Sequence, residues 1–120
     1  LSTLGQLDEA LTAFQAGKMG ASGRTAMDLY TGIGAIEFLK DNKSAAEDAF
    51  LQAITADPEG AALAYTNLGV LRITQGRYAE AKELFETAAE QDREGKTQAR
   101  EYLKSLQTLM ESTSGNATTL

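Results

Sequence analysis

Apolar and small residues recur along the chain at a spacing of 35 positions. The same residue type stands at both members of these pairs: Tyr30 and Tyr65, Thr31 and Thr66, Gly34 and Gly69, Ala46 and Ala81, Phe50 and Phe85, Ala53 and Ala88, Asp57 and Asp92. Upstream, Ala10 and Phe14 repeat the spacing of Ala46 and Phe50. Self-similarity at one fixed spacing is typical of proteins built from stacked structural repeats.

Local signals divide each repeat into two helices. Ser44 and Glu47 have the spacing of a capping box, in which a hydroxyl and a carboxylate bind the free amides of a helix start. The run 57–59 (Asp-Pro-Glu) indicates an N-cap followed by a proline in the first helical turn, and Gly76 indicates a break between two helices. We predict helices over residues 6–17, 24–41, 44–56, 59–75, 78–92 and 96–111.

The segments outside these helices have a different composition. Residues 17–23 (GKMGASG) predict a flexible connection, and residues 112–120 (STSGNATTL) lack any hydrophobic period. A chain of 120 residues is long enough for one domain with a modest core. We therefore expect one helical domain over residues 1–111 and a disordered tail over 112–120.

The segment 64–92 resembles a tetratricopeptide repeat. The signature positions of that family are occupied here by Tyr65, Leu68, Gly69, Gly76, Tyr78, Ala81, Phe85 and Ala88. Residues 27–60 match through Tyr30, Ile33, Gly34, Ala46, Phe50, Ala53 and Pro58, and residues 1–17 resemble the end of a preceding repeat. The resemblance implies an all-α fold of antiparallel helix pairs stacked as a short solenoid. It would contain about two full repeats, a preceding half repeat and a C-terminal capping helix.

Packing considerations agree with this fold. Gly34 and Ala46 are small residues on facing sides of one predicted helix pair, and they let the two backbones approach closely. Phe50 would fill the space beside that crossing. The residues 35 positions later predict the same arrangement in the next pair.

Two positions depart from the family pattern. Glu37 and Arg72 occupy equivalent places where the family usually has a large apolar residue. We expect them to form an ion pair across the repeat boundary. Asp41 stands at the place of Gly76, which predicts a less typical turn in the first full repeat.

The net negative charge of the chain disfavours some classes of binding partner. The chain has 17 acidic and 11 basic residues, a net charge of −6, and no cluster of Lys and Arg. Nucleic-acid binders need a basic stripe, and anionic membranes repel an acidic chain, so we expect neither partner. The sequence contains no run of 18 apolar residues, so we expect no membrane insertion. The chain shows no targeting segment, and its location stays open.

The sequence predicts no catalytic, metal or cofactor site, and we expect the protein not to be an enzyme. It has no Cys and no His, which removes the usual thiolate nucleophile, general base and transition-metal ligands. The glycines of residues 17–23 have the wrong spacing for a phosphate loop, and the following Arg24 replaces the required lysine. The carboxylates at helical spacing indicate a solvated helix face.

A stripe on the first helix of each repeat is the candidate binding site. In related repeats this side faces a concave groove and touches ligands. The candidate groove residues are Thr31, Ala35, Phe38, Leu39, Leu63, Thr66, Asn67, Val70 and Ile73. A contiguous apolar patch of this kind is costly in water and favours a partner that covers it, although the C-terminal helix or a second copy of the chain could also cover it.

These observations favour a non-catalytic interaction module. Only Asn67 fits the basic and amide clamp that some relatives use for chaperone C-termini, so an apolar peptide or an amphipathic helix is the expected partner. The alternative is a structural, self-associating segment of a longer tetratricopeptide scaffold. Helix 6–17 would lack the helix that covers its apolar side, which predicts contact with another copy or with further repeats.

Overall fold

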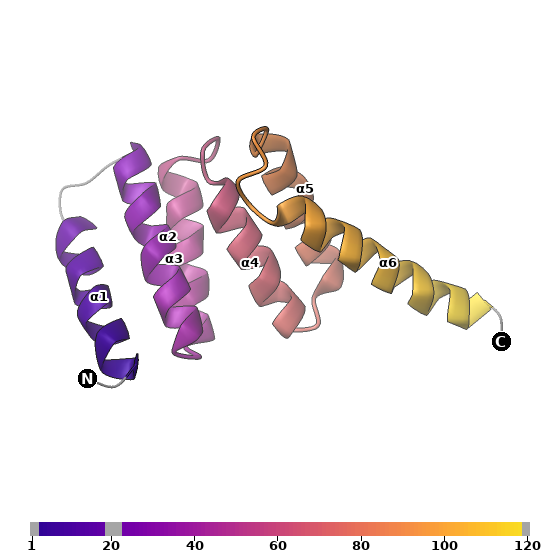
Figure 1. The fold of residues 1–120 in the computed structure, drawn as a ribbon, viewed down its shortest axis with the longest axis horizontal. Coiled ribbons are helices and arrows are strands. Elements are labelled where there is room, and N and C mark those ends of the chain that lie inside the picture. The colour runs from indigo at the N-terminus through magenta and orange to yellow at the C-terminus, as the bar shows by residue number, and fades with distance from the viewer. Residues whose placement is uncertain (1–2, 19–22, 119–120) are drawn as a thin grey trace.

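The structure is a computed structural model that describes residues 3–18 and 23–118. Within these two ranges all regular secondary structure is helical. The helices are α1 (Thr3–Lys18), α2 (Gly23–Leu39), α3 (Lys43–Ala56), α4 (Ala62–Thr74), α5 (Tyr78–Gln91) and α6 (Ala99–Thr118). Each helix packs on its neighbour in the sequence, and the helices stand in one row (Figure 1).

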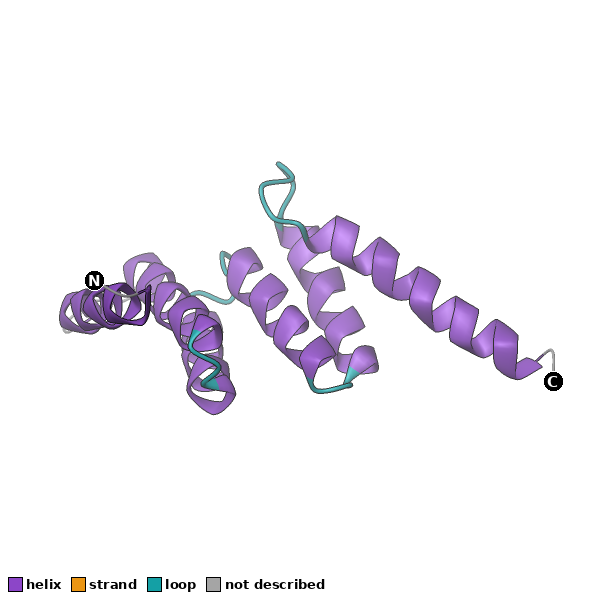
Figure 2. Ribbon diagram, turned by 60° about the horizontal axis from the view of Figure 1, so that its bottom comes forward, coloured by secondary structure: helices purple, strands orange, loops and turns teal. Residues whose placement is uncertain are grey.

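The row is built from helix pairs. Helix α2 pairs with α3 and α4 pairs with α5, while α2 also packs on α4. Helix α1 precedes these two pairs and α6 follows them, with the C-terminal half of α6 running away from the row (Figure 2). The predicted all-α solenoid is therefore confirmed.

The turns inside the two pairs have the same backbone geometry. Asp41 and Gly76 both have positive φ angles, 64° and 73°. Their amides donate to the carbonyls of Phe38 and Ile73 at 2.9 and 3.0 Å, respectively. The expectation of a less typical turn at Asp41 is wrong, because aspartate tolerates the left-handed conformation better than most residues with a side chain.

Two of the predicted capping signals need correction. Asn42 rather than Ser44 is the N-cap of α3, and no side-chain capping hydrogen bond forms there. The turn that closes α2 already carries the chain into α3, so the helix begins before Ser44 is reached. Pro58 lies in the turn between α3 and α4, because the amide of Gly60 bonds to the carbonyl of Asp57 and α4 begins only at Ala62.

Helix α6 differs from its prediction at both ends. It begins at Ala99 instead of residue 96, and it continues to Thr118, whereas we expected the helix to end at 111 and residues 112–120 to be disordered. Ser, Thr, Asn and Gly have weak helix propensity, but extending an existing helix costs far less than starting one. Residues 119–120 lie outside the described part of the chain.

Glycines allow the two helix pairs to close. A Cβ atom at Gly34 would lie 2.5 Å from ring carbons of Phe50, and one at Gly69 would lie 2.5 Å from a ring carbon of Phe85. Both phenylalanines are fully buried. The small residues predicted at the crossings thus admit the aromatic rings, and each pair has its own apolar centre.

Charged residues at the repeat boundary pair differently from the prediction. Arg72 is 7% exposed and does not bind Glu37. Its Nη2 lies 2.6 Å from Glu47 and its Nε lies 3.2 Å from Glu80. Glu37 pairs instead with Lys40, 3.9 Å away in the turn that follows α2, so the expected ion pair between Glu37 and Arg72 is wrong.

Helix α1 packs on α2 and also forms an ion pair with the turn that follows α2. Lys40 donates to the carboxylate of Asp8. Leu7, Ala10 and Leu11 are partly buried, and the side chain of Phe14 is outside the described residues. The apolar side of α1 is thus less open than the sequence suggested. Of the predicted connection 17–23, residues 19–22 also lie outside the described ranges.

Candidate protein-binding groove

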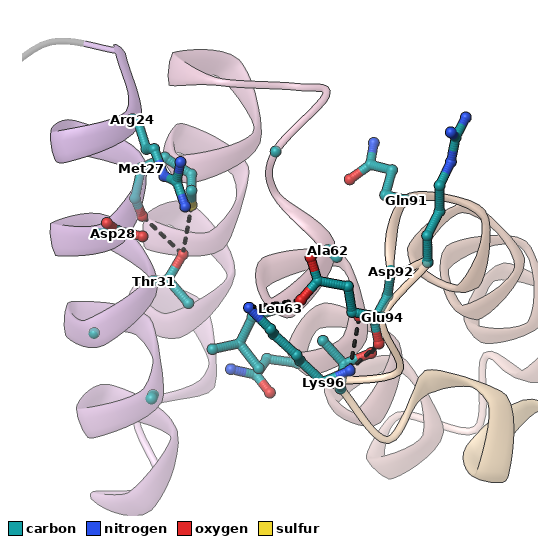
Figure 3. Close-up of a pocket in the computed structure, with 16 residues that line it drawn as sticks. Arg24, Met27, Asp28, Thr31, Ala62, Leu63, Gln91, Asp92, Glu94 and Lys96 are labelled. Carbon is teal, nitrogen blue, oxygen red and sulfur yellow. Dashed lines mark hydrogen bonds and ion pairs between the residues drawn. The ribbon is translucent and has the colours of Figure 1, made fainter.

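Helices α2 and α4 and the loop between α5 and α6 surround an open groove (Figure 3). Its upper section has a volume of about 700 Å³. The upper section is lined by Arg24, Asp28, Thr31 and Ala35 of α2, by Leu63 and Asn67 of α4, and by Asp92, Arg93, Glu94, Lys96 and Thr97 of the loop. Charged side chains of both signs therefore stand around this section.

A lower, apolar section continues the groove. It has a volume of about 250 Å³ and is lined by Ala35, Phe38, Leu39, Phe50, Asn67, Val70 and Tyr102. Ala35 and Asn67 line both sections, which makes the two sections one continuous groove. The lower section adds a wall from α6 through Tyr102.

The loop that closes the upper section is held by one carboxylate. Asp92 is 8% exposed and accepts hydrogen bonds from the hydroxyl and amide of Thr97, each at 2.6 Å, and from the amide of Lys96 at 2.8 Å. The hydroxyl of Thr97, followed by its amide, lowers the pKa of Asp92 below its ordinary value. The Asp92 carboxylate thus has a structural role, because its hydrogen bonds hold the loop that forms this wall of the groove.

Most of the predicted groove residues line the groove. Ala35 and Asn67 line both sections, Thr31 and Leu63 line the upper one, and Phe38, Leu39 and Val70 line the lower one. Thr66 and Ile73 line neither section. Thr66 is buried and donates its hydroxyl to the carbonyl of Ala62, whereas Ile73 packs into the cluster formed with α6.

The side chains of the predicted groove residues also differ in how far they are exposed to solvent. Leu39 is 71% exposed and Leu63 is 52% exposed, and both border the groove. Thr31 is 5% exposed and its hydroxyl bonds to the carbonyl of Met27, which leaves little of it for a ligand. Val70 packs against the α6 cluster. Helix α6 therefore covers part of the predicted stripe, and Leu39 and Leu63 remain accessible.

The sequence reasoning missed the residues that the loop and α6 bring to the groove. Lys96 and Glu94 of the loop form an exposed ion pair at 2.9 Å, and Tyr102 stacks on Phe85 with ring centres 5.5 Å apart. The repeat alignment carried no information on the loop. Tyr102 does resemble Tyr65, since each is the fourth residue of its helix.

The described helices form a stack of helix pairs with a groove along α2 and α4. Residues 62–94, which span α4, α5 and the start of the following loop, match the tetratricopeptide repeat family. This segment of the chain is therefore similar to one tetratricopeptide repeat. No curated protein matches the chain.

The match over residues 62–94 implies a general kind of function. Tetratricopeptide repeats are protein–protein interaction modules and in general are not catalytic folds. Among the described residues, none of the helices has the length and apolarity that crossing a membrane requires. The described residues also bring no three acidic side chains together in a way that could hold a metal ion.

Proposed function

We propose that the groove between α2, α4 and α6 binds an apolar peptide or an amphipathic helix of another protein. The observation that carries this proposal is the exposure of Leu39 and Leu63, 71% and 52%, on the border of a groove with an apolar lower section. Large apolar side chains that gather beside a concave surface favour a covering partner.

The two sections of the groove suit a segment of mixed character. Apolar side chains of the partner would pack against Phe38 and Leu39 in the lower section. Polar or charged groups would reach the upper section, where Arg24 and Lys96 stand. Asn67 lies where the sections meet, and its amide can both donate and accept hydrogen bonds. An amphipathic segment offers this combination.

Paired serine variants test the groove. Leu39→Ser with Leu63→Ser should weaken binding of a neutral amphipathic peptide of leucine, serine and glutamine by about tenfold or more, since each leucine buries apolar area worth about 1.5–3 kcal/mol. Fluorescence anisotropy of the labelled peptide measures the affinity.

Leu109→Ser is the matched control, because Leu109 is 50% exposed but lies on α6 outside the groove lining. Circular dichroism should show unchanged helicity for all variants. If the peptide binds the doubly substituted groove as tightly as it binds the Leu109 variant, the groove is not the binding site.

A second candidate function is a structural segment of a longer scaffold. Helix α3 packs between α2 and α4, whereas the main packing partner of α1 among the described helices is α2. Residues 6–17 could therefore join another copy of the chain or a further repeat. Sedimentation analysis tests self-association. If the chain is such a structural segment, we expect dimers that dissociate when Leu7 and Leu11 are replaced by Ser.

A further inference from the structure

The outer face of the stack carries two clefts that occupy equivalent places in the two repeats. The first outer cleft lies between α1 and α3 over α2 and has a volume of about 180 Å³. The second lies between α3 and α5 over α4 and has a volume of about 340 Å³. The pairs Ile33 and Leu68, Glu37 and Arg72, and Asp48 and Glu83 line the two clefts at corresponding positions. None of these residues lines the groove.

The second outer cleft supplies its own cation. Arg72 is directed to three acceptors: Glu47 at 2.6 Å, Gln75 at 2.9 Å and Glu80 at 3.2 Å. The hydrogen bond from Arg72 lowers the pKa of Glu47, which keeps the Glu47 carboxylate charged at neutral pH. The buried Arg72 guanidinium therefore has hydrogen-bonding and charged partners within the chain.

The first outer cleft has a carboxylate at the same position and lacks an equivalent donor. Glu37 Oε1 is buried without a hydrogen-bond donor in the described part of the chain. The nearby Lys40 Nζ is 3.9 Å away, too far for a hydrogen bond, and it donates to Asp8 instead. A buried carboxylate oxygen without a donor is unfavourable, so a cation that enters this cleft would be stabilised.

The rims of both clefts are acidic, and the second has an apolar floor. Asp48 on the first rim and Glu83 on the second are exposed and take part in no ion pair with another described residue. In the second cleft, Leu51 is 43% exposed opposite the partly buried Leu84. Both Asp48 and Leu51 belong to α3, so the acidic and the apolar features lie on one helix.

We propose that this outer face is a second docking surface, which takes a basic amphipathic segment of a partner protein. A lysine or arginine of the segment would enter the first outer cleft beside Glu37 and Asp48. An apolar side chain would lie between Leu51 and Leu84 in the second. Charge complementarity selects this occupant, since the rim residues without ion pairs are acidic and the chain carries a net charge of −6. A second copy of the same acidic chain is disfavoured for the same reason.

The test uses the full chain and two synthetic probes. One probe is a short amphipathic peptide of leucine and lysine, and the other has glutamate in place of each lysine. Both are titrated at low salt into protein that carries Leu39→Ser and Leu63→Ser, so that the groove is disabled. Amide chemical shifts should move at Asp48 and Leu51 with the lysine peptide, and the glutamate peptide should bind at least tenfold more weakly.

Charge-matched variants locate the effect. Asp48→Asn with Glu83→Gln should reduce the affinity for the lysine peptide about fivefold or more at low salt, and less at high salt, because rim charges are screened. Glu86→Gln with Glu90→Gln removes the same charge from exposed positions of α5 outside both clefts and should cost less than twofold. Leu51→Ser should weaken binding without changing helicity.

Three results would overturn the proposal: equal losses from the two charge-matched pairs, equal binding of the two peptides, or shifts confined to groove amides such as that of Asn67. The first two results do not bear on the groove, and the third would place the lysine peptide in it. The groove proposal itself is tested separately, by the neutral peptide and the Leu39 and Leu63 variants. Failure of the outer-face proposal and failure of the groove proposal are thus distinguishable.

Discussion

The two full repeats, α2–α3 and α4–α5, share a backbone but differ in their polar contacts. At the crossing, Gly34 faces Phe50 in the first pair as Gly69 faces Phe85 in the second. Three backbone hydrogen bonds at each turn also correspond at a spacing of 35, those donated by the amides of Asp41, Asn42 and Ala46 and by those of Gly76, Arg77 and Ala81. Yet the position of Glu37 in the first repeat is held by an arginine in the second.

This contrast shows which interactions specify the fold. Small residues and aromatic rings at the crossing recur because the close approach of two backbones leaves room for few alternatives. Charged side chains vary because each can reach several partners, and exposed pairs contribute only about 0–1 kcal/mol. The apolar pattern therefore defines the repeat, while the charges distinguish one repeat from the other.

The largest expected effect comes from filling the glycine sites. Gly69→Leu should destabilise the domain by about 3 kcal/mol or more, because a Cβ at Gly69 would already lie 2.5 Å from the ring of Phe85. Gly34→Leu should cost a similar amount against Phe50. Urea unfolding measures both. A variant of either glycine that unfolds at the wild-type midpoint would show that the two crossings are not equivalent.

Replacing Arg72 and replacing Glu37, which occupy equivalent positions in the two repeats, should change the stability of the domain in opposite directions. Arg72→Met should destabilise by about 1–3 kcal/mol, since it leaves Glu47 without its partner in a partly buried place. Glu37→Met should be neutral or stabilising, because it removes a carboxylate oxygen that is buried without a donor. Thermal unfolding of both variants checks the signs.

A double-mutant cycle isolates the pair in the second repeat. Combining Arg72→Met with Glu47→Gln should cost less than the sum of the two single changes. Additive costs would mean that the contact at 2.6 Å contributes nothing to stability.

The sequence predicted the fold well because its signals were apolar and local. The spacing of Tyr, Gly, Ala and Phe placed the helix pairs, and Gly76 marked a turn that the structure confirms through its φ of 73°. The helix starts were less predictable. Several polar residues near each turn could serve as caps, and only the path of the preceding turn decides which of them is used.

The groove was predictable only in part. The stripe on α2 and α4 followed from the repeat pattern, and most of its members line the groove. The sequence did not predict the wall formed by Lys96 and Tyr102, since the position of this wall depends on the direction in which α6 leaves the loop. The bonds of Asp92 hold that loop, and no periodicity in the sequence reveals them.

A smaller effect is expected in the turns, where the two repeats use different residues for one conformation. Asp41→Gly should stabilise the domain and Gly76→Asp should destabilise it, each by about 1 kcal/mol, because only glycine adopts a positive φ without steric cost. Chemical unfolding measures both changes. Destabilisation by Asp41→Gly would indicate that the aspartate side chain contributes more to the turn than its backbone strain costs.

The smallest expected effect concerns Asp57 and Asp92, which end α3 and α5 with the same backbone bonds. Only Asp92 also holds its following loop, through Thr97 and Lys96, and these bonds lower its pKa. A lowered folded-state pKa stabilises the fold above the ordinary pKa of aspartate, about 3.9, and this stabilisation is lost as the pH falls through the folded-state value. Asp92→Asn should therefore lower the melting temperature at pH 7, and the difference from wild type should shrink as the pH falls below 4. Melting curves recorded across that range for both proteins test the expectation, and a difference that is constant with pH would exclude the carboxylate charge as its source.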